Sequence, residues 1–468
     1  MHYSMAGGSA MHARQEKNAM FISFDAVSVS GITVEAMKIA KRLQACGFRS
    51  YLDLGYDIKI DKGNFNKPYR HEHDIYRDVF TLVRLDGITS IPDYCPAFLD
   101  YAHAALIGQK TPIDEQEKVA LLHTIALKAR QLADRLIAQW EALAISHVVV
   151  ENGTLPENII YTKALYLAIE DYGRRYRLTR FVIWRDHDLM WNSEKKVLKY
   201  GPPPYSHAIK PIASKYITYV TLNHDLKQKL EAWCNHDVHV EVKKNTYDFS
   251  ESLERINCRK QINIRENDIL IARTTRIIPQ KRLDRDIVLV SKLNDLFIRD
   301  NNTRRVCLAI AGNEYENPSC YLQLAKLAQE LQVLPYVKFV GMLPHASMRS
   351  QSDTLCIEDL YYSCDLVSFL TSYDYDSYGN PIGEAVSCRR CYIATSYEYY
   401  HEVYGQHGFE APIMTISELH DGLPSDEFVD ELYQFINNKE KMRRVAENNF
   451  TLGKRVLSNN VMEYLNIS

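Results

Sequence analysis

The sequence predicts an α/β protein made of two doubly wound domains with parallel sheets. Apolar strands alternate with amphipathic helices across residues 19–250, and the alternation starts again across residues 251–425. A chain of 468 residues is long enough for two such domains. We expect residues 1–18 to form a flexible leader and helices within 426–468 to pack back across both domains.

The first domain opens with a crossover unit. The apolar strand AMFISFDAVS at 19–28 precedes a stretch whose apolar residues recur at helical spacing until Gly47, and the strand SYLDL follows. A strand, a helix and a strand in such close succession indicate parallel pairing. After a less regular region at 55–113, we expect a long helix at 114–143.

The alternation then continues into the second domain. The strand SHVVVENG, a helix within NIIYTKALYLAIEDYG, the strand RFVIW at 180–184 and the segments YITYVTLN and HVEVKKNTYDF complete the first series. DILIART opens the second series, and its later strands are RVCLAIAG, VKFVG, DLVSFLT and CYIAT. Ligands of such sheets collect at the carboxyl ends of the strands, so we expect a small-molecule site in the cleft between the domains.

Composition and charge limit the classes of function. A formal net charge of -3 gives no general attraction to nucleic acid. No window reaches the roughly 18 consecutive apolar residues of a membrane helix, and the N-terminus lacks the apolar core of a signal peptide. Ten scattered cysteines indicate reduced thiols. We therefore expect a cytoplasmic protein with no transmembrane segment and no nucleic-acid partner.

Two sequence elements of the second domain suit phosphate groups. Arg276 and Lys281 lie in the loop TRIIPQKRLD after a strand, and such cations suit a diphosphate, although a solvated basic loop is the alternative. Gly379 and Pro381 predict a turn followed by a helix, whose positive end would face a bound anion.

Two acids flank this turn. Asp376 precedes it and Glu384 lies on the first turn of the helix, so both carboxylates can face one cleft. There they would accept hydrogen bonds from sugar hydroxyls. The alternative is that both are helix-start acids stabilised by the helix dipole.

In the first domain, a charged run follows a buried strand. RFVIWRDHDLMW places Arg185, Asp186, His187 and Asp188 there, where charge is costly unless it faces a cleft. We expect His187 to bond a sugar, with Asp186 or Asp188 orienting the ring. Two other strand ends supply Glu151, Asn152, Gly153 and Gly31, and Gly31 would permit close approach of a ligand.

Together these segments resemble the glycosyltransferases of family 4, which are retaining enzymes of the GT-B fold. The resemblance extends from Ala19 to about Val403. Its most specific element is the pair of acids around a Gly-x-Pro turn, which is DSYGNPIGE in this sequence. TRIIPQK, the His-Asp pair after RFVIW, NTYDF and FVG match further family elements in the same order.

Within the family, NGTLPENI, RDHDLMW and TRIIPQKRLDRDIVLVSKL look more like the mannosylglucosylglycerate synthases. The sequence also departs from the family pattern. Asp376 replaces the usual Glu, which shortens a sugar-contacting carboxylate by one methylene. Arg389 and Cys391 in CRRC replace Gly and Pro, so we expect different local packing there.

The resemblance implies that the second domain holds a nucleotide diphosphate sugar and the first domain binds a hydroxyl acceptor. The implied catalytic residues are His187, Asp376, Arg276 and Lys281. The implied donor-binding residues are Gly31, Arg276, Lys281, Gly379, Asn380, Pro381, Ile382 and Glu384. The acceptor side would include Asn152, Arg185, Asp186 and Asp188. No metal or other cofactor is implied, because Arg, Lys and a helix end would carry the charge.

Alternatives stay open at this level. A nucleotide-sugar 2-epimerase shares the two-domain fold, and so would a catalytically idle nucleotide-sugar-binding protein.

Other motifs are weaker signals. RHEHD at 70–74 lacks the spacing of a metal site, and Cys388 and Cys391 have no second pair of cysteines nearby with which to form a zinc or redox site. We expect the tyrosines near 373–400 to pack around the cleft, with stacking on a ligand as the alternative. KMRR at 441–444 predicts a solvated helix face, with contact to a membrane surface as the alternative. The acceptor, donor base and oligomeric state stay open.

Overall fold

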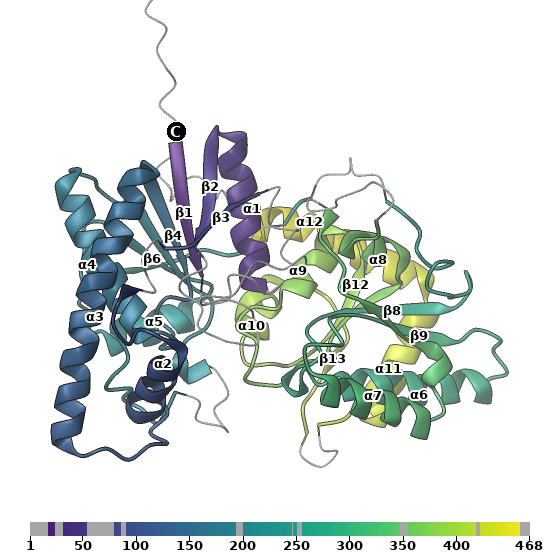
Figure 1. The fold of residues 1–468 in the computed structure, drawn as a ribbon. Helices are drawn as coiled ribbons and strands as arrows, with labels where there is room; N and C mark the ends of the chain where they lie inside the picture. The colour runs from purple at the N-terminus through teal and green to yellow at the C-terminus, as the bar shows by residue number, and fades with distance from the viewer. Residues whose placement is uncertain are drawn as a thin grey trace, which may run out of the picture.

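The computed structural model places two parallel-sheet domains side by side (Figure 1). It describes residues 17–23, 31–53, 79–85, 90–192, 200–245, 247–249, 255–346, 354–417 and 422–458. The predicted leader lies outside these residues except for Lys17 and Asn18, which begin the first strand.

The first domain contains a seven-stranded sheet of order β3-β2-β1-β4-β5-β6-β7. All of its strand pairs are parallel. Its strands are β1 (Lys17–Ser23), β2 (Phe48–Asp53), β3 (Thr81–Val83), β4 (Ile145–Glu151), β5 (Val182–Asp186), β6 (Ile217–Thr221) and β7 (Val240–Val242). Its helices are α1 (Gly31–Ala45), α2 (Pro96–Ala102), α3 (Glu115–Ala142), α4 (Ile159–Arg175) and α5 (His224–Trp233), with a π-helical segment at His103–Ile107 and a 3-10 turn at Met190–Asn192.

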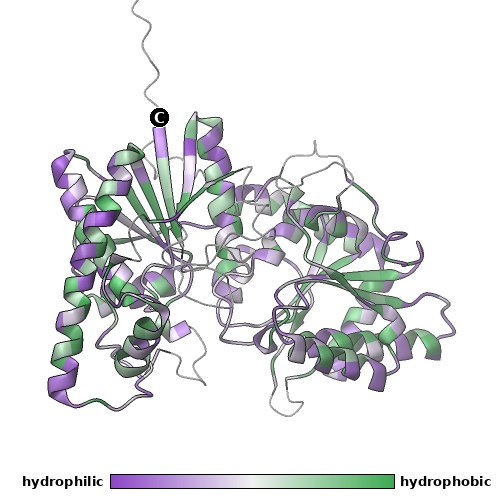
Figure 2. Cartoon of the chain, viewed as in Figure 1, coloured by the Kyte–Doolittle hydropathy of each residue, from purple (hydrophilic) through white to green (hydrophobic). Residues whose placement is uncertain are grey.

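Alternating residues of β1 explain why helices cover both faces of this sheet. Met20 and Ile22 belong to the core that includes α3 and α4, whereas Ala19 and Phe21 pack with α1. Figure 2 shows apolar residues concentrated along the strands between these helices.

The second domain repeats the plan with a six-stranded sheet of order β10-β9-β8-β11-β12-β13. Its strands are β8 (Ile269–Thr274), β9 (Val306–Ala311), β10 (Val337–Gly341), β11 (Leu366–Phe369), β12 (Cys391–Thr395) and β13 (Ile413–Met414). Its helices are α6 (Leu283–Arg299), α7 (Pro318–Glu330), α8 (Ile357–Ser363), α9 (Asn380–Ser387), α10 (Tyr400–Val403), α11 (Asp426–Asn437) and α12 (Lys439–Val456), with 3-10 turns at Pro279–Lys281, Leu334–Tyr336 and Gly405–His407.

The last helix, α12, packs against the second domain and against residues that follow β7. Gly453 of α12 lies so close to Val386 and Phe249 that an added Cβ would sit 2.6 Å from the Val386 side chain. Lys244, which follows β7, donates a hydrogen bond to the carbonyl of Val456 (3.5 Å). Within the described residues, α12 therefore contacts the second domain and, through Lys244 and Phe249, the end of the segment 19–250 predicted as the first domain.

The predicted fold class is confirmed: two doubly wound α/β domains face a central cleft. The strand predictions agree with β1, β2, β4–β7 and β8–β12. β1 begins at Lys17 rather than at residue 19, and the part of that prediction at 24–28 lies outside the described residues. The helix predicted at 114–143 is α3. Its start is fixed by a capping box, in which Asp114 accepts from the Glu117 amide (2.8 Å) and Glu117 accepts from the Asp114 amide (3.1 Å).

Candidate functional site

A cavity of about 780 Å³ lies between the two domains. In each sheet the strand order reverses beside the first strand of its series, between β1 and β4 and between β8 and β11. Such switch points are where doubly wound sheets bind ligands. Of the predicted site residues, those that line the cavity are Gly31, His187, Asp188, Arg276, Lys281, Asp376, Gly379, Asn380, Pro381 and Glu384.

The loop after β8 is anchored by a buried arginine. Arg273 donates to the carbonyl of Lys281 (2.8 Å) and to that of Ser368 on β11 (2.9 Å). At the end of β9, a Cβ added to Gly312 would lie 2.2 Å from the carbonyl oxygen of Thr275, so only glycine permits this close approach. The loop that carries Arg276 and Lys281 is therefore fixed to the sheet.

Both cations of this loop have carboxylate partners. Arg276 Nε donates to Glu316 Oε1 at 2.6 Å. The Lys281 ammonium forms an ion pair with Asp376, and these side chains are 13% and 15% exposed. Lys281 also lies 4.8 Å from the ring centroid of Tyr375. A phosphate bound in the cavity would compete with Glu316 for Arg276 and with Asp376 for Lys281. The two cations can therefore neutralise part of its negative charge.

The tyrosines of the second domain hold the turn before α9. Gly379 has φ 90°, a conformation that favours glycine. The carbonyl of Tyr378 accepts from Tyr397 (2.6 Å), and that of Gly379 accepts from Tyr404 (2.8 Å). These hydroxyls fix the turn at the start of α9. Pro381 has no amide hydrogen and the Ile382 amide donates to the carbonyl of Gly379 (3.0 Å), so it is the positive end of the helix as a whole that suits an anion there. Tyr378, Tyr397 and Tyr404 are buried, as expected for packing. Tyr375 and Tyr378 line the cavity.

Asn380 joins the turn to the first domain. Its Oδ1 accepts from Asn245 Nδ2 (2.8 Å) and from the Tyr247 hydroxyl (2.9 Å). A Cβ on Gly31 would lie 3.1 Å from Asn380 Nδ2, so α1 and α9 begin close together. The segment after β7 thus fixes the approach of the two helix starts.

The side chains around Glu384 were not predicted from the sequence to belong to the site. Its Oε2 accepts from Tyr361 (3.1 Å), and its Oε1 is 3.6 Å from His345 Nε2. Burial raises the pKa of Glu384, although His345 and Lys38 oppose the rise. Burial lowers the pKa of His345, but Glu384 and Glu358 outweigh it and raise the pKa overall. The only sequence signal for His345 is its place shortly after the strand end FVG.

A buried carboxylate of β4 orients His187. Glu151 Oε2 lies 2.7 Å from His187 Nε2, and its Oε1 accepts from Arg185 (2.9 Å). Asn152 Oδ1 accepts from the backbone amides of His187 and Asp188. The residue that fixes the imidazole is therefore Glu151 rather than Asp186 or Asp188.

Several predicted residues lie behind the cavity wall. Asp186 accepts from the amide and the hydroxyl of Thr154 (3.2 and 2.6 Å), and burial raises its pKa to about 7, although Thr154 opposes the rise. Arg185 bonds to Glu151 and reaches Asn245 (3.4 Å). Asn152, Arg185, Asp186 and Ile382 do not line the cavity. Asp188 does, and burial raises its pKa.

The sequence also raised the questions of a metal site, a cysteine pair and a membrane helix. Within the described residues, no three His, Cys, Asp or Glu side chains form a group able to hold a metal ion, and RHEHD lies outside those residues. Burial raises the pKa of both Cys388 and Cys391 to about 12, so these thiols stay protonated near neutral pH. No helix in the described ranges is both long and apolar enough to cross a membrane.

No protein-family model matches the chain, and neither does any curated protein sequence. Solved structures do match. HepE of Anabaena in complex with UDP and glucose has a TM-score of 0.57 at 13% identity, over 96% of this chain and 97% of that chain. The sucrose-phosphate synthase of Thermosynechococcus elongatus has a TM-score of 0.59 at 10% identity, over 96% of both chains. WaaG, a glycosyltransferase involved in lipopolysaccharide biosynthesis, has a TM-score of 0.53 at 14% identity, over 93% of this chain and 95% of that chain.

These matches cover nearly the whole chain and both domains. With the two switch points facing one cavity, they define the chain as a protein of the GT-B fold. At this level of identity they show the fold alone.

Proposed function

We propose that the chain is a retaining glycosyltransferase. It would move a hexose from a nucleotide diphosphate sugar, of the GDP-mannose or UDP-glucose type, to a hydroxyl of a small soluble or glycan acceptor. The observation that carries the proposal is the cavity, which collects Lys281, Glu384 and the start of α9 from one domain and His187 from the other. The match to HepE with UDP and glucose bound supports the choice of donor class.

The proposed donor contacts follow from charge and position. Arg276, Lys281 and the positive end of α9 would neutralise the charge that grows on the leaving diphosphate. Preorganised donors of this kind are usually the largest catalytic contribution, and losing one costs on the order of a hundredfold or more in rate. Glu384 would accept hydrogen bonds from the ribose hydroxyls, so its neighbours His345 and Tyr361 would position it.

The sugar would lie between the domains. Asp376 would contact its ring hydroxyls, and His187, with its ring fixed by Glu151, would contact its primary hydroxyl. In front-side transfer the bond from the anomeric carbon to the diphosphate oxygen breaks, and its electron pair leaves with the diphosphate. The acceptor oxygen bonds to the same face and its proton passes to the leaving phosphate. The proposal needs no nucleophilic carboxylate and no metal.

The proposal places the reaction in the cytoplasm. The ten cysteines all lie in described residues and none forms a disulfide, which supports a reducing compartment.

A product assay tests the function. Purified protein is incubated with UDP- and GDP-linked glucose and mannose, with and without a mixture of small acceptors, and nucleoside diphosphate release is followed. We expect acceptor-dependent release and a product whose anomeric configuration, read by NMR, matches the donor. Lys281→Ala should abolish release. The matched control is Lys292→Ala, which removes a lysine of α6 that pairs with Asp426 of α11, and it should not abolish release.

Two other outcomes would decide against transfer. Conversion of the donor to its 2-epimer without acceptor would identify an isomerase. Binding of donors without any product would identify a nucleotide-sugar-binding protein.

A further inference from the structure

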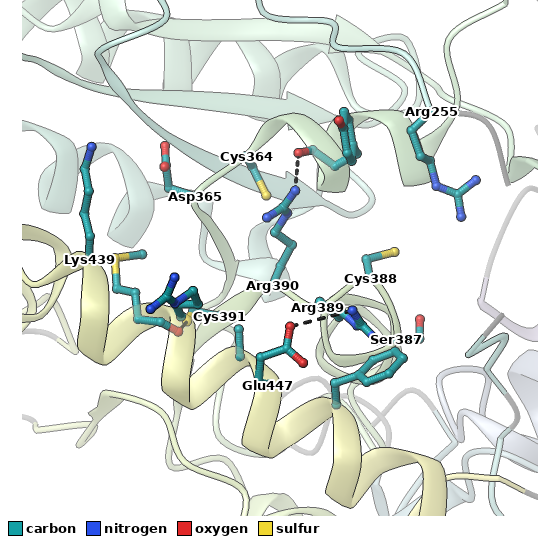
Figure 3. Close-up of a pocket in the computed structure, with 15 residues that line it drawn as sticks. Arg255, Cys364, Asp365, Ser387, Cys388, Arg389, Arg390, Cys391, Lys439 and Glu447 are labelled. Carbon is teal, nitrogen blue, oxygen red and sulfur yellow. Dashed lines mark hydrogen bonds and ion pairs between the residues drawn. The ribbon is translucent and has the colours of Figure 1, made fainter. Parts of the chain in front are cut away.

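A second cavity, of about 640 Å³, lies on the second domain (Figure 3). Arg255, the ends of α8 and α9 and one side of α12 form its walls. None of its lining residues lines the cavity between the domains. We call it the basic pocket.

Positive charge dominates the lining. Five cationic side chains line it, against the two carboxylates of Asp365 and Glu447, and the cations are Arg255, Arg389, Arg390, Lys439 and Arg443. Asp365 is already engaged, because it accepts from Arg259 (2.7 Å) and from the amide of Leu270 (2.8 Å). The pocket therefore has more positive charge than its own carboxylates balance.

Arg389 stands in a backbone conformation that favours glycine. It has φ 53° directly after α9, and the amides of Arg389 and Arg390 bond to the carbonyls of Val386 (3.1 Å) and Ala385 (2.9 Å). Helices commonly end this way with glycine at the left-handed position. Any residue other than glycine strains the backbone there, and contacts of the side chain must offset that strain. Its guanidinium lies 4.1 Å from the centroid of the Phe450 ring and 3.7 Å from Glu447 (Figure 3).

Two further arginines shape the pocket. Arg390 donates to the carbonyls of Tyr361 (2.8 Å) and Tyr362 (2.5 Å), which fixes one wall at the end of α8. Arg255 Nη1 is buried and has no hydrogen-bond partner within the described residues. A buried donor without a partner is costly, and an anion in the pocket would supply one.

We propose that the basic pocket binds the phosphate group of a small phosphorylated metabolite. The cavity has the size of a small-molecule site, and arginine forks match phosphate oxygens. An anionic membrane is the competing source of phosphate, and binding to it is strengthened by apolar side chains that insert beside the cations. Among described residues, α12 contributes no exposed large apolar side chain, and the rim contributes only Tyr362.

Equilibrium dialysis with radiolabelled inorganic phosphate tests the proposal at fixed ionic strength. The double variant Lys439→Gln/Arg443→Gln removes two exposed cations of the pocket. Its control, Lys441→Gln/Arg444→Gln, removes the same charge from α12 outside the pocket. Phosphate bound between the domains would be unchanged in both, so their difference reports the basic pocket alone. We expect the first variant to bind phosphate at least about tenfold more weakly and the control to match the unmodified protein.

A second variant separates weaker phosphate binding from a loss of stability. Arg389→Gly removes a pocket cation and suits the left-handed backbone, so we expect weaker phosphate binding without a lower melting temperature. Equal phosphate affinity in all four proteins would overturn the proposal. So would a result in which Lys439→Gln/Arg443→Gln abolishes binding to vesicles of phosphatidylcholine and phosphatidylglycerol while phosphate affinity stays the same.

Discussion

Replacing Gly379 by alanine should damage both stability and nucleotide binding. The residue has φ 90°, and the left-handed region costs a residue other than glycine about 1–2 kcal/mol. An added Cβ would lie 2.5 Å from the Tyr397 hydroxyl, which must move and release the carbonyl of Tyr378. That hydrogen bond contributes about 1 kcal/mol. We therefore expect Gly379→Ala to lower the free energy of unfolding by about 2–3 kcal/mol.

The chain offers a matched control. Gly408 has φ 88°, and nothing lies within 4 Å of its added Cβ. Gly408→Ala should therefore cost the backbone strain of about 1–2 kcal/mol alone and leave nucleotide affinity unchanged. In a Tyr397→Phe background, Gly379→Ala should also cost less, because the nearest atom is then on Phe369 at 3.2 Å.

Urea unfolding and titration with UDP and GDP measure both effects. We expect Gly379→Ala to weaken binding of the preferred nucleotide about tenfold or more, since the turn positions the start of α9. If Gly379→Ala and Gly408→Ala had equal stabilities and the same nucleotide affinity, the tyrosine-supported turn would not form the anion site.

Four further predictions follow from the described contacts. Lys281→Ala should lower kcat/KM about a hundredfold or more with the fold intact, and steady-state kinetics within a few-fold of the unmodified protein would refute its phosphate contact. Asp376→Glu should change donor preference or kcat more than melting temperature, and no change in either would remove its sugar contact. Asp186 has a folded pKa of about 7 against an ordinary 3.8, so the folded state binds the extra proton and the free energy of unfolding should fall as pH rises through this window. Urea unfolding across the window should show up to about 4 kcal/mol of this dependence, absent in Asp186→Asn, and an unchanged slope would contradict the assignment. Arg389→Gly should leave the free energy of unfolding unchanged or raise it by up to about 1 kcal/mol, because relief of the backbone strain offsets the lost contacts with Phe450 and the half-exposed Glu447; a destabilised variant would refute this reading.

The fold was largely predictable because its signals are local. Strands buried on both faces appear as continuous apolar runs, as in β8 and β9, and α3 starts at a capping box. β3 and β13 were not predicted, because their three and two residues are too few for any periodicity to show. α5 was not predicted either, although Asn223 caps that helix by accepting from the Leu226 amide (2.8 Å).

The positions of the site residues could be predicted from the sequence, but their hydrogen-bond and ion-pair partners could not. Strand ends identified Lys281 and Asp376, yet the ion pair that joins them spans 95 positions of sequence. Arg185 and Asp186 are neighbours on β5, where successive side chains point to opposite faces. One therefore meets Glu151 and the other Thr154, and the charged run does not face the cleft as a unit.

The central claim is that the cavity binds a nucleotide diphosphate sugar, and a thermal-shift panel tests it most directly. The panel comprises UDP, GDP and ADP and their glucose, mannose and N-acetylglucosamine conjugates. A ligand that binds only the folded state stabilises it by RT ln(1 + [L]/Kd), so the melting temperature rises with the concentration and the affinity of the ligand. We predict selective stabilisation by one nucleotide, enhanced by one sugar and lost in Lys281→Ala. No shift with any compound at millimolar concentration would contradict the claim.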